Sequence, residues 1–262
     1  LPVYHIYAFT ALMYALRVGA HTAFVPNPRD LSSVINAFKT YKPLLFCGLN
    51  TLFVALCNDE KFRSLDFTEL QVTLSGGMAL TNDCAIRWAG VTNCEISEGY
   101  GLTETSPTIS ANPGNGRRIG TIGLPVPNTE IQVRAGNGEI LGFEEAGELC
   151  VRGPQIMSGY WNRPESTVEV IDCNGWFATG DIAIVEPDGY LRIVDRKKDM
   201  IIVSGFNVYP NELEEVLAAH PNVVECAVIG VPSVTSGEEI RMFVVRGELE
   251  LSEKDVVDFM KQ

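Results

Sequence analysis

The first 110 residues alternate between apolar positions of helical period and short continuous apolar runs. In one segment Leu31, Val34, Ile35 and Phe38 fall on a single helical face, and Pro43 closes the pattern. Another segment opens with Thr81, a residue type that caps helices. Alternation of this kind predicts α/β layers with a largely parallel sheet. The expected helices are 31–41, 51–58 and 81–89, and the expected buried strands are 44–47 and 70–75.

The first 25 residues, LPVYHIYAFTALMYALRVGAHTAFV, are strongly apolar. His5, Arg17 and His21 interrupt the run, and no basic region precedes it. These features favour a buried helix followed by a strand over a signal peptide or a membrane span.

The pattern changes between residues 116 and 195, where short β-like segments are separated by turn signals. Asn137-Gly138 and Asp188-Gly189 are dipeptides typical of tight turns. This succession of short strands and turns predicts a meander or a small barrel attached to the α/β part. The expected strands are 130–134, 147–152, 182–186 and 190–194.

A third pattern of apolar and polar positions begins after Asp195 and predicts a small α+β module. Its expected elements are a strand at 199–204, a helix at 210–219 and strands at 223–231 and 240–246. The final residues form an amphipathic pattern, so we expect a last helix with Val256, Val257, Phe259 and Met260 turned inward. Both ends lack terminating signals, and we therefore expect the chain to be a piece of a longer protein.

The composition narrows the class of function. The chain has 262 residues, of which 46% are hydrophobic, so a substantial core is expected. Its formal charge of −13 argues against nucleic acid as a partner, because phosphate binding needs a basic face. The single basic cluster, Arg196-Lys197-Lys198, is too short to make such a face.

Cysteine and histidine usage is also informative. The seven cysteines are scattered and include no C-x-x-C pair, a pattern typical of a reducing compartment. With three histidines in the whole chain, a His-rich metal centre is excluded.

The stretch SEGYGLTETSP, residues 97–107, has a carboxylate and two hydroxyl groups shortly after two glycines. One interpretation is an ordinary strand-to-loop connection with solvated polar groups. The other is that Gly99 and Gly101 let the backbone approach a flat ligand on which Tyr100 stacks. Thr103 would then supply a hydroxyl and Glu104 a hard oxygen ligand for Mg²⁺.

Two further stretches carry candidate residues. Gly76 and Gly77 end an expected strand at the edge where open α/β sheets bind ligands, although a simple turn is the favoured interpretation of this stretch by itself. Asp181 follows Gly180 before an apolar segment. A carboxylate there can accept hydrogen bonds from the two hydroxyls of a ribose, and the alternative is an Asx turn.

Together with GYLRIVDRKKDMIIVSGFNVYPNELE, residues 189–214, these segments resemble the adenylate-forming superfamily. The similarity is greatest to bacterial long-chain fatty-acid–CoA ligases, through LPVYHIYA, NTLF, EGYGLTE, IGLPVP, GELCVRGPQIMSGYW and GDIA. It implies an α/β fold, with the C-terminal part of the large AMP-binding domain followed by a truncated α+β C-terminal domain. The implied boundaries are 1–197, divided into an α/β portion 1–115 and a β-barrel-like portion 116–197, and 198–262.

The resemblance also implies residue roles in binding ATP or AMP. Thr103 contacts phosphate, Glu104 holds Mg²⁺, and Asp181 and Arg196 bind the ribose hydroxyls, for which arginine offers planar donors. The residues implied at the adenine base are Gly76, Gly77, Gly99 and Tyr100, and Gly101 is also implied in cofactor binding.

Other implied roles concern the acyl group and coenzyme A. Lys198 falls at the hinge of the C-terminal domain, and Gly205 and Phe206 lie in the loop that faces the pantetheine of CoA. His5 borders the acyl pocket, whereas without the resemblance a core histidine is the natural interpretation.

The implied activity is ATP-dependent activation of a fatty acid through acyl-AMP and its transfer to CoA. Alternatives are a ligase that loads a carrier protein and a non-catalytic nucleotide-binding module. A phosphate loop ending in Lys-Gly and a C-terminal catalytic lysine belong to this family and are absent from 1–262, so we expect this piece alone to be inactive. A cytoplasmic location is implied, with peripheral attachment to the inner membrane and homodimer formation left open.

Overall fold

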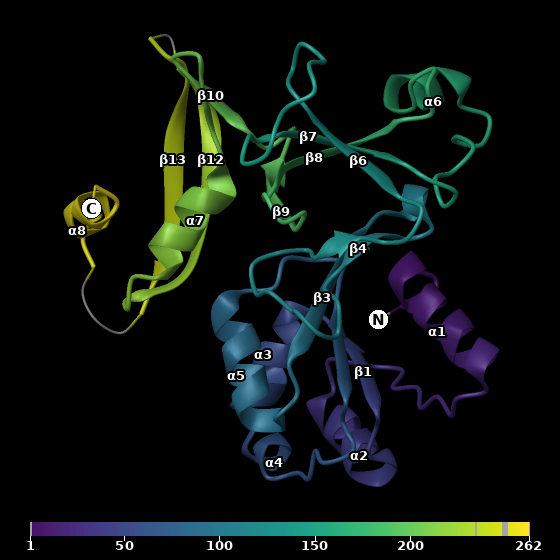
Figure 1. Cartoon of the computed structure of the whole chain (residues 1–262). Coiled ribbons are helices and arrows are strands. Elements are labelled where there is room, and N and C mark those ends of the chain that lie inside the picture. The colour runs from purple at the N-terminus through teal and green to yellow at the C-terminus, as the bar shows by residue number, and fades with distance from the viewer. Residues whose placement is uncertain (1, 234, 248–250, 262) are drawn as a thin grey trace. The chain divides into compact units, whose positions relative to one another are not determined.

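The computed structural model describes residues 2–233, 235–247 and 251–261, and these form a mixed α/β fold with three sheets (Figure 1). The chain divides into two compact units that interleave along the sequence. Unit 1 comprises Leu1–Gln132, Cys150–Thr179 and Val185–Arg192, and unit 2 comprises Val133–Leu149, Gly180–Ile184 and Ile193–Gln262. The α/β fold class is confirmed, and the domain boundaries at 115 and 197 stay predictions.

Unit 1 contains a five-stranded sheet in the order β1-β2-β3-β4-β5. The first three strands are parallel and the last two antiparallel, so the expected parallel sheet is confirmed for the part that alternates with helices. The strands are β1 (Leu45–Gly48), β2 (Val72–Ser75), β3 (Ile96–Gly101), β4 (Thr108–Ala111) and β5 (Leu124–Pro125).

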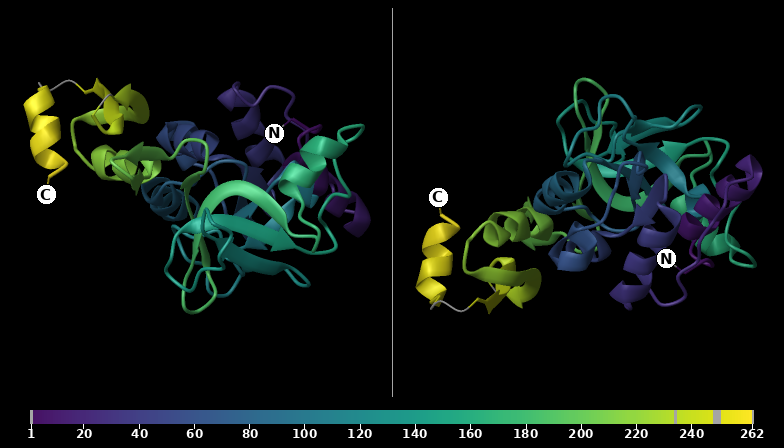
Figure 2. Two further views of the ribbon diagram at one scale, coloured as in Figure 1. Left: turned by 90° about the horizontal axis from the view of Figure 1, so that it is seen from above. Right: turned by 90° about the horizontal axis from the view of Figure 1, so that it is seen from below.

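Helices cover both sides of this sheet. Figures 1 and 2 show α3 and α5 on one side of the parallel strands and α1 on the other. Thr81 caps α5 as predicted, because its hydroxyl accepts a hydrogen bond from the backbone N–H of Cys84. The helices are α1 (Ile6–Val18), α2 (Leu31–Tyr41), α3 (Asn50–Asn58), α4 (Glu60–Arg63) and α5 (Asn82–Thr92), with a 3-10 turn η1 (Thr103–Thr105) after β3.

The core of unit 1 is an aromatic cluster. The Phe46 ring stacks on Trp88, and Phe38 meets Phe46 edge-on at a centroid distance of 4.8 Å. Phe53 and Phe62 are fully buried beside them. The predicted inward face of 31–41 supplies part of this core, which holds β1 and β2 in the register that brings their carboxyl ends together.

The N-terminal segment differs from its prediction in two ways. Helix α1 forms, but Ala8 is its one buried residue, and apolar side chains such as Phe9, Tyr14 and Leu16 are exposed. The strand expected after it is wrong, since residues 20–30 are irregular. The helix meets the sheet through the face that carries Tyr7 and Ala8, where the Tyr7 hydroxyl bonds to the carbonyl of Leu74, so its apolar side chains are buried on one face only. No helix in the described ranges is long and apolar enough to cross a membrane.

A second sheet has the order β6-β7-β8-β9, which is the sequential order of a meander. Strand β8 begins five residues before its predicted start, so Asp181 lies inside a strand and the Asx-turn alternative is wrong. The strand starts at Phe177, which is buried, and the residues between Phe177 and Ile182 show no apolar alternation that could have predicted it. The elements are β6 (Glu130–Arg134), β7 (Gly147–Arg152), α6 (Pro164–Val170), β8 (Phe177–Val185) and β9 (Leu191–Arg196).

The third sheet, in the order β11-β10-β13-β12, forms most of unit 2. Phe259 of α8 packs edge-on against His220. Val256, Phe259 and Met260 are half-buried as expected, but Val257 is 49% exposed, so its inward placement is wrong. The elements are β10 (Ile201–Val203), β11 (Phe206–Val208), α7 (Pro210–Ala218), β12 (Val223–Ser233), β13 (Gly237–Arg246) and α8 (Glu253–Phe259).

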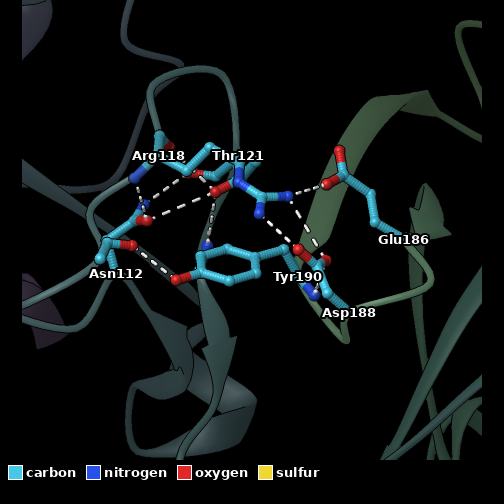
Figure 3. A network of polar contacts seen from close by, with 8 residues as sticks. Asn112, Arg118, Thr121, Glu186, Asp188 and Tyr190 are labelled. Atoms are coloured by element: carbon cyan, nitrogen blue, oxygen red, sulfur yellow. Dashed lines mark hydrogen bonds and ion pairs between the residues drawn. The ribbon is translucent and has the colours of Figure 1, made fainter.

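An arginine-centred network in unit 1 joins the loop after β4 to the β8–β9 turn (Figure 3). Arg118 pairs with both Glu186 and Asp188, and its guanidinium carbon lies 4.1 Å from the centroid of the Tyr190 ring. Tyr190 donates its hydroxyl hydrogen to the carbonyl of Gly116 at 2.5 Å. Several charges share one arginine here, and such a network stabilises a surface connection more than an isolated exposed pair does.

Candidate active site

Two glycines meet at the carboxyl end of the parallel strands. Ser75 of β2 pairs with Glu98 of β3, so Gly76 and Gly99 follow side by side. A Cβ atom on Gly76 would lie 3.3 Å from the carbonyl oxygen of Gly99, a tight contact. The structure therefore brings together two residues predicted at the nucleotide base. Their backbone carries no side chains at the edge where α/β sheets bind ligands, and we call this edge, formed by Gly76, Gly77 and Gly99, the glycine edge.

Gly101 has a packing role of its own. A Cβ atom there would lie 1.7 Å from the carbonyl oxygen of Pro107, because the chain folds back on itself between β3 and β4. Leu102 donates its backbone N–H to the same oxygen at 3.0 Å. Gly101 is thus required by the turn, and its part in nucleotide binding stays a prediction.

The turn after β3 is held rigidly. Thr105 is fully buried, and its hydroxyl bonds to the carbonyl of Pro107 while accepting from the backbone N–H of Leu102. Thr103 is exposed and Glu104 half-buried on the same turn. Thr103, predicted at the phosphate, and Glu104, predicted at Mg²⁺, therefore lie on a turn that is held by these hydrogen bonds.

Glu104 is also bonded to the segment after β7, a contact that the sequence did not predict. Tyr160 donates its hydroxyl hydrogen to Glu104 Oε1 at 2.8 Å, and the backbone N–H of Met157 donates to the Glu104 carbonyl at 2.8 Å. Partial burial, and then the Glu104 carboxylate, raise the pKa of the Tyr160 phenol, so it is protonated and a donor at neutral pH.

The donor set around Glu104 fits a nucleotide-borne Mg²⁺. No group of three or more His, Cys, Asp or Glu side chains able to hold a metal exists among the described residues. Mg²⁺ keeps several waters and takes one or two carboxylates together with substrate phosphates. A single half-buried glutamate therefore suits Mg²⁺ that arrives with a nucleotide and does not suit a permanent protein-only site.

The start of α1 reaches the glycine edge. His5 caps α1 through Nδ1, which accepts from the backbone N–H of Tyr7 at 3.2 Å, and its Cε1 would lie 3.9 Å from a Cβ on Gly77. Tyr7 donates its hydroxyl hydrogen to the carbonyl of Leu74 at 3.0 Å. His5 is exposed, so the core-histidine interpretation is wrong, and the structure places His5 beside Gly77.

A half-buried carboxyl group lies beside the same edge. Burial raises the pKa of Glu98 to about 7, and the backbone N–H of Leu80, which donates to Oε1 at 3.2 Å, offsets part of that rise. Sequence analysis did not single out Glu98. Its one sequence signal is a carboxylate placed directly before the glycine-rich turn.

Unit 2 brings Asp181 and Arg196 together. Arg196 Nε lies 3.5 Å from Asp181 Oδ1, and the backbone N–H of Lys197 donates to the Gly180 carbonyl at 2.9 Å. Asp181 is buried, whereas the arginine side chain is largely exposed. The two residues predicted at the ribose are therefore neighbours.

The remaining predicted residues lie in or directly after turns of unit 2. Lys198 is exposed in the turn between β9 and β10. Gly205 lies in the tight turn between β10 and β11 with a φ of +86°, and Phe206 after it is 74% exposed. Asp195, which sequence analysis did not single out, is buried and accepts from the backbone N–H of Asn211 at 3.0 Å, so it joins β9 to the start of α7.

Comparison with known families is decisive for classification. The model of the AMP-binding enzyme family matches residues 1–161, and that of the AMP-binding enzyme C-terminal domain matches residues 212–262. This chain belongs to the AMP-binding enzyme family. The glycine edge and Glu104 lie within the first matched region.

Relatives of this AMP-binding chain include several ligases. A long-chain-fatty-acid–CoA ligase of Yersinia pestis is 47% identical over 259 residues, which are 98% of this chain and 46% of that protein. A feruloyl-CoA synthase of an Amycolatopsis species is 36% identical over 246 residues, which are 93% of this chain and 50% of that protein. The chain thus spans about half the length of the curated relatives it matches.

Solved structures show the same architecture. ATP-bound MatB from Rhodopseudomonas palustris matches with a TM-score of 0.91 at 31% identity, covering 100% of this chain and 52% of MatB. The o-succinylbenzoate CoA synthetase MenE from Bacillus subtilis, in complex with the acyl-adenylate OSB-AMP, matches with a TM-score of 0.85 at 26% identity, covering 100% of this chain and 53% of MenE. The AMP-binding fold is therefore established for the whole described chain.

Proposed function

We propose that the full-length protein containing this chain is an AMP-forming long-chain fatty-acid–CoA ligase. The observation that carries the substrate class is the 47% identity with the Yersinia pestis ligase across 98% of the chain. Within unit 1, a bare glycine edge and a carboxylate suited to Mg²⁺ support nucleotide binding. Within unit 2, the Asp–Arg pair offers an acceptor and planar donors to a sugar diol.

In the first half-reaction, a carboxylate oxygen of the fatty acid attacks the α-phosphorus of ATP, and the bond from that phosphorus to the bridging oxygen breaks. Pyrophosphate leaves with the bond electrons, and acyl-AMP forms. Mg²⁺, when bound, neutralises phosphate charge. Gly76, Gly99 and Tyr100 receive the base, Thr103 contacts phosphate, and Glu104 orients the cation, so the protein acts by positioning and electrostatics.

In the second half-reaction, the thiolate of CoA attacks the acyl carbon, the bond from that carbon to the AMP oxygen breaks, and AMP leaves. We assign Lys198 to the hinge of the C-terminal domain, and Gly205 and Phe206 to the loop that meets pantetheine. The exposure of all three residues, with Lys198 and Gly205 in turns and Phe206 at the start of β11, supports both assignments. His5 beside Gly77 supports a place for it near the reacting carboxylate.

The cellular setting is part of the same proposal. None of the seven cysteines, all of which lie in the described ranges, takes part in a disulfide bond, which supports a reducing cytoplasm. Peripheral attachment to the inner membrane and homodimer formation are further predictions, and co-sedimentation with vesicles and light scattering of the full-length protein test them.

The experiment that tests this function measures acyl-CoA formation by the full-length protein from ATP, palmitate and free CoA. We expect AMP and palmitoyl-CoA in equal amounts. Transfer of the acyl group only to the phosphopantetheine of a carrier protein would replace the ligase with a carrier-loading enzyme. Nucleotide binding without acyl-AMP would leave a binding module.

A further inference from the structure

The segment after β7 contacts Glu104 at two points. Tyr160 donates its hydroxyl hydrogen to Oε1 at 2.8 Å, and Met157 donates its backbone N–H to the carbonyl of the same residue at 2.8 Å. The two partners are separated from Glu104 by more than 50 residues of sequence. Both the backbone and the carboxylate of Glu104 are therefore fixed from one neighbouring segment of unit 1.

Tyr160 is itself held in place at its backbone. Its N–H donates to Thr167 Oγ1, on α6, at 2.9 Å. Gly159 has a φ of +146°, and a Cβ there would lie 2.7 Å from the Thr167 side chain, so glycine permits this approach. Earlier in the segment, Gln155 donates to Thr129 Oγ1 at 2.7 Å. The backbone of Tyr160 is therefore held in place while its phenol hydroxyl bonds to Glu104.

The hydrogen bond contributes orientation more than stability. Tyr160 is 37% exposed, so water can satisfy its hydroxyl if the carboxylate is removed. The bond engages Oε1 and favours one orientation of the carboxylate plane. Groups that hold a metal-binding carboxylate in this way change metal affinity with little effect on folding.

We propose that Tyr160 is a positioning residue for the cation that accompanies the nucleotide. Its hydroxyl would hold the Glu104 carboxylate in one orientation for binding the Mg²⁺ of Mg·ATP. This inference rests on the proposed function, which places Mg²⁺ at Glu104, and it extends that function to a residue on a different element of unit 1.

The test compares Tyr160→Phe with the unchanged full-length protein in the absence of fatty acid. Electron paramagnetic resonance follows the binding of Mn²⁺, a spectroscopic substitute for Mg²⁺, in the presence of ATP. We expect the Mn²⁺ dissociation constant to rise about tenfold, as for other partners of metal-binding side chains. The thermal midpoint should stay unchanged, because the phenol is partly exposed.

A kinetic measurement separates positioning from a general structural effect. In ATP–pyrophosphate exchange, Tyr160→Phe should raise the KM for Mg²⁺ while kcat at saturating Mg²⁺ stays within about twofold of the unchanged protein. The matched control is Tyr190→Phe, which removes a tyrosine hydroxyl bond to a backbone carbonyl elsewhere in unit 1. This control should leave Mn²⁺ affinity unchanged.

Glu104→Gln distinguishes the inference from the function on which it rests. If this variant loses Mn²⁺ affinity and Tyr160→Phe binds Mn²⁺ like the unchanged protein, the positioning role is wrong and the cation site stands. If Glu104→Gln also binds Mn²⁺ normally, the cation site itself is wrong and the inference falls with it. An equal loss of affinity in Tyr190→Phe would likewise overturn the role of Tyr160.

Discussion

Arg196 lies beside the Asp181 carboxylate, with Nε 3.5 Å from Oδ1. The aspartate side chain is 8% exposed and the arginine 59%, so a largely buried charge is compensated from the surface. A sugar diol that reached this pair would meet an acceptor and a planar set of donors together. The pairing therefore makes ribose binding testable with one isosteric substitution.

Replacing Asp181 by Asn removes the charge and keeps the shape. We expect the KM for ATP of the full-length protein to rise about tenfold or more, because hydrogen bonds to charged groups contribute about 1.5–3 kcal/mol. The change in kcat should be smaller. Glu148→Gln is the control, since it breaks the 2.7 Å pair with Lys197 in the same unit. Equal KM values for Asp181→Asn and the control would refute ribose binding.

Gly99 and Gly101 should respond differently to alanine. A Cβ on Gly99 would lie 3.5 Å from the carbonyl oxygen of Ser110, an ordinary contact, whereas one on Gly101 would overlap Pro107. We expect Gly101→Ala to lose on the order of 3 kcal/mol of stability and Gly99→Ala less than about 1 kcal/mol. If Gly99 lies at the base, its alanine variant should bind ATP about tenfold more weakly. Urea unfolding and ATP titration measure both quantities, and normal ATP binding by Gly99→Ala would contradict that placement.

Glu98 should make stability depend on pH. Burial raises its pKa in the folded protein to about 7 from an ordinary value of 4.5, so between these values the native state holds a proton that the unfolded state has lost. The free energy of unfolding should therefore fall as pH rises from 4.5 to about 7, by up to a few kcal/mol. Glu98→Gln should remove this part of the slope in urea unfolding measured from pH 4.5 to 8. An unchanged slope in the variant would show that another group is responsible.

Lys198→Pro tests the hinge. The turn is closed by backbone N–H groups of Asp199 and Met200, which donate to the Arg196 carbonyl, so proline at 198 leaves both bonds in place. It restricts the backbone about which a domain could rotate. We expect thioester formation to slow on the order of tenfold or more while pyrophosphate exchange is nearly retained, as for other hinge substitutions. Equal loss in both half-reactions would argue against the hinge.

Local patterns predicted most of the elements. The face formed by Leu31, Val34, Ile35 and Phe38 defines α2, and the Thr81 cap places the start of α5 correctly. These features depend on side chains within a few residues of one another, so the sequence contains the whole signal.

Features that depend on distant or very short segments were missed. Strand β11 follows a turn in which Ser204 and Gly205 both have positive φ, and its three residues are too few to show alternation. The bond between Tyr160 and Glu104 joins segments that only tertiary structure brings together. In α1, the sequence shows apolar side chains but cannot say what packs against them.

ATP–pyrophosphate exchange by the full-length protein tests the central claim most directly. Labelled pyrophosphate should enter ATP only when a long-chain fatty acid and Mg²⁺ are present, and Glu104→Ala should reduce the exchange by on the order of 100-fold, since it removes the carboxylate that orients the cation. Exchange that does not depend on a fatty acid, or that Glu104→Ala leaves intact, would contradict the assignment of this chain to fatty-acid adenylation.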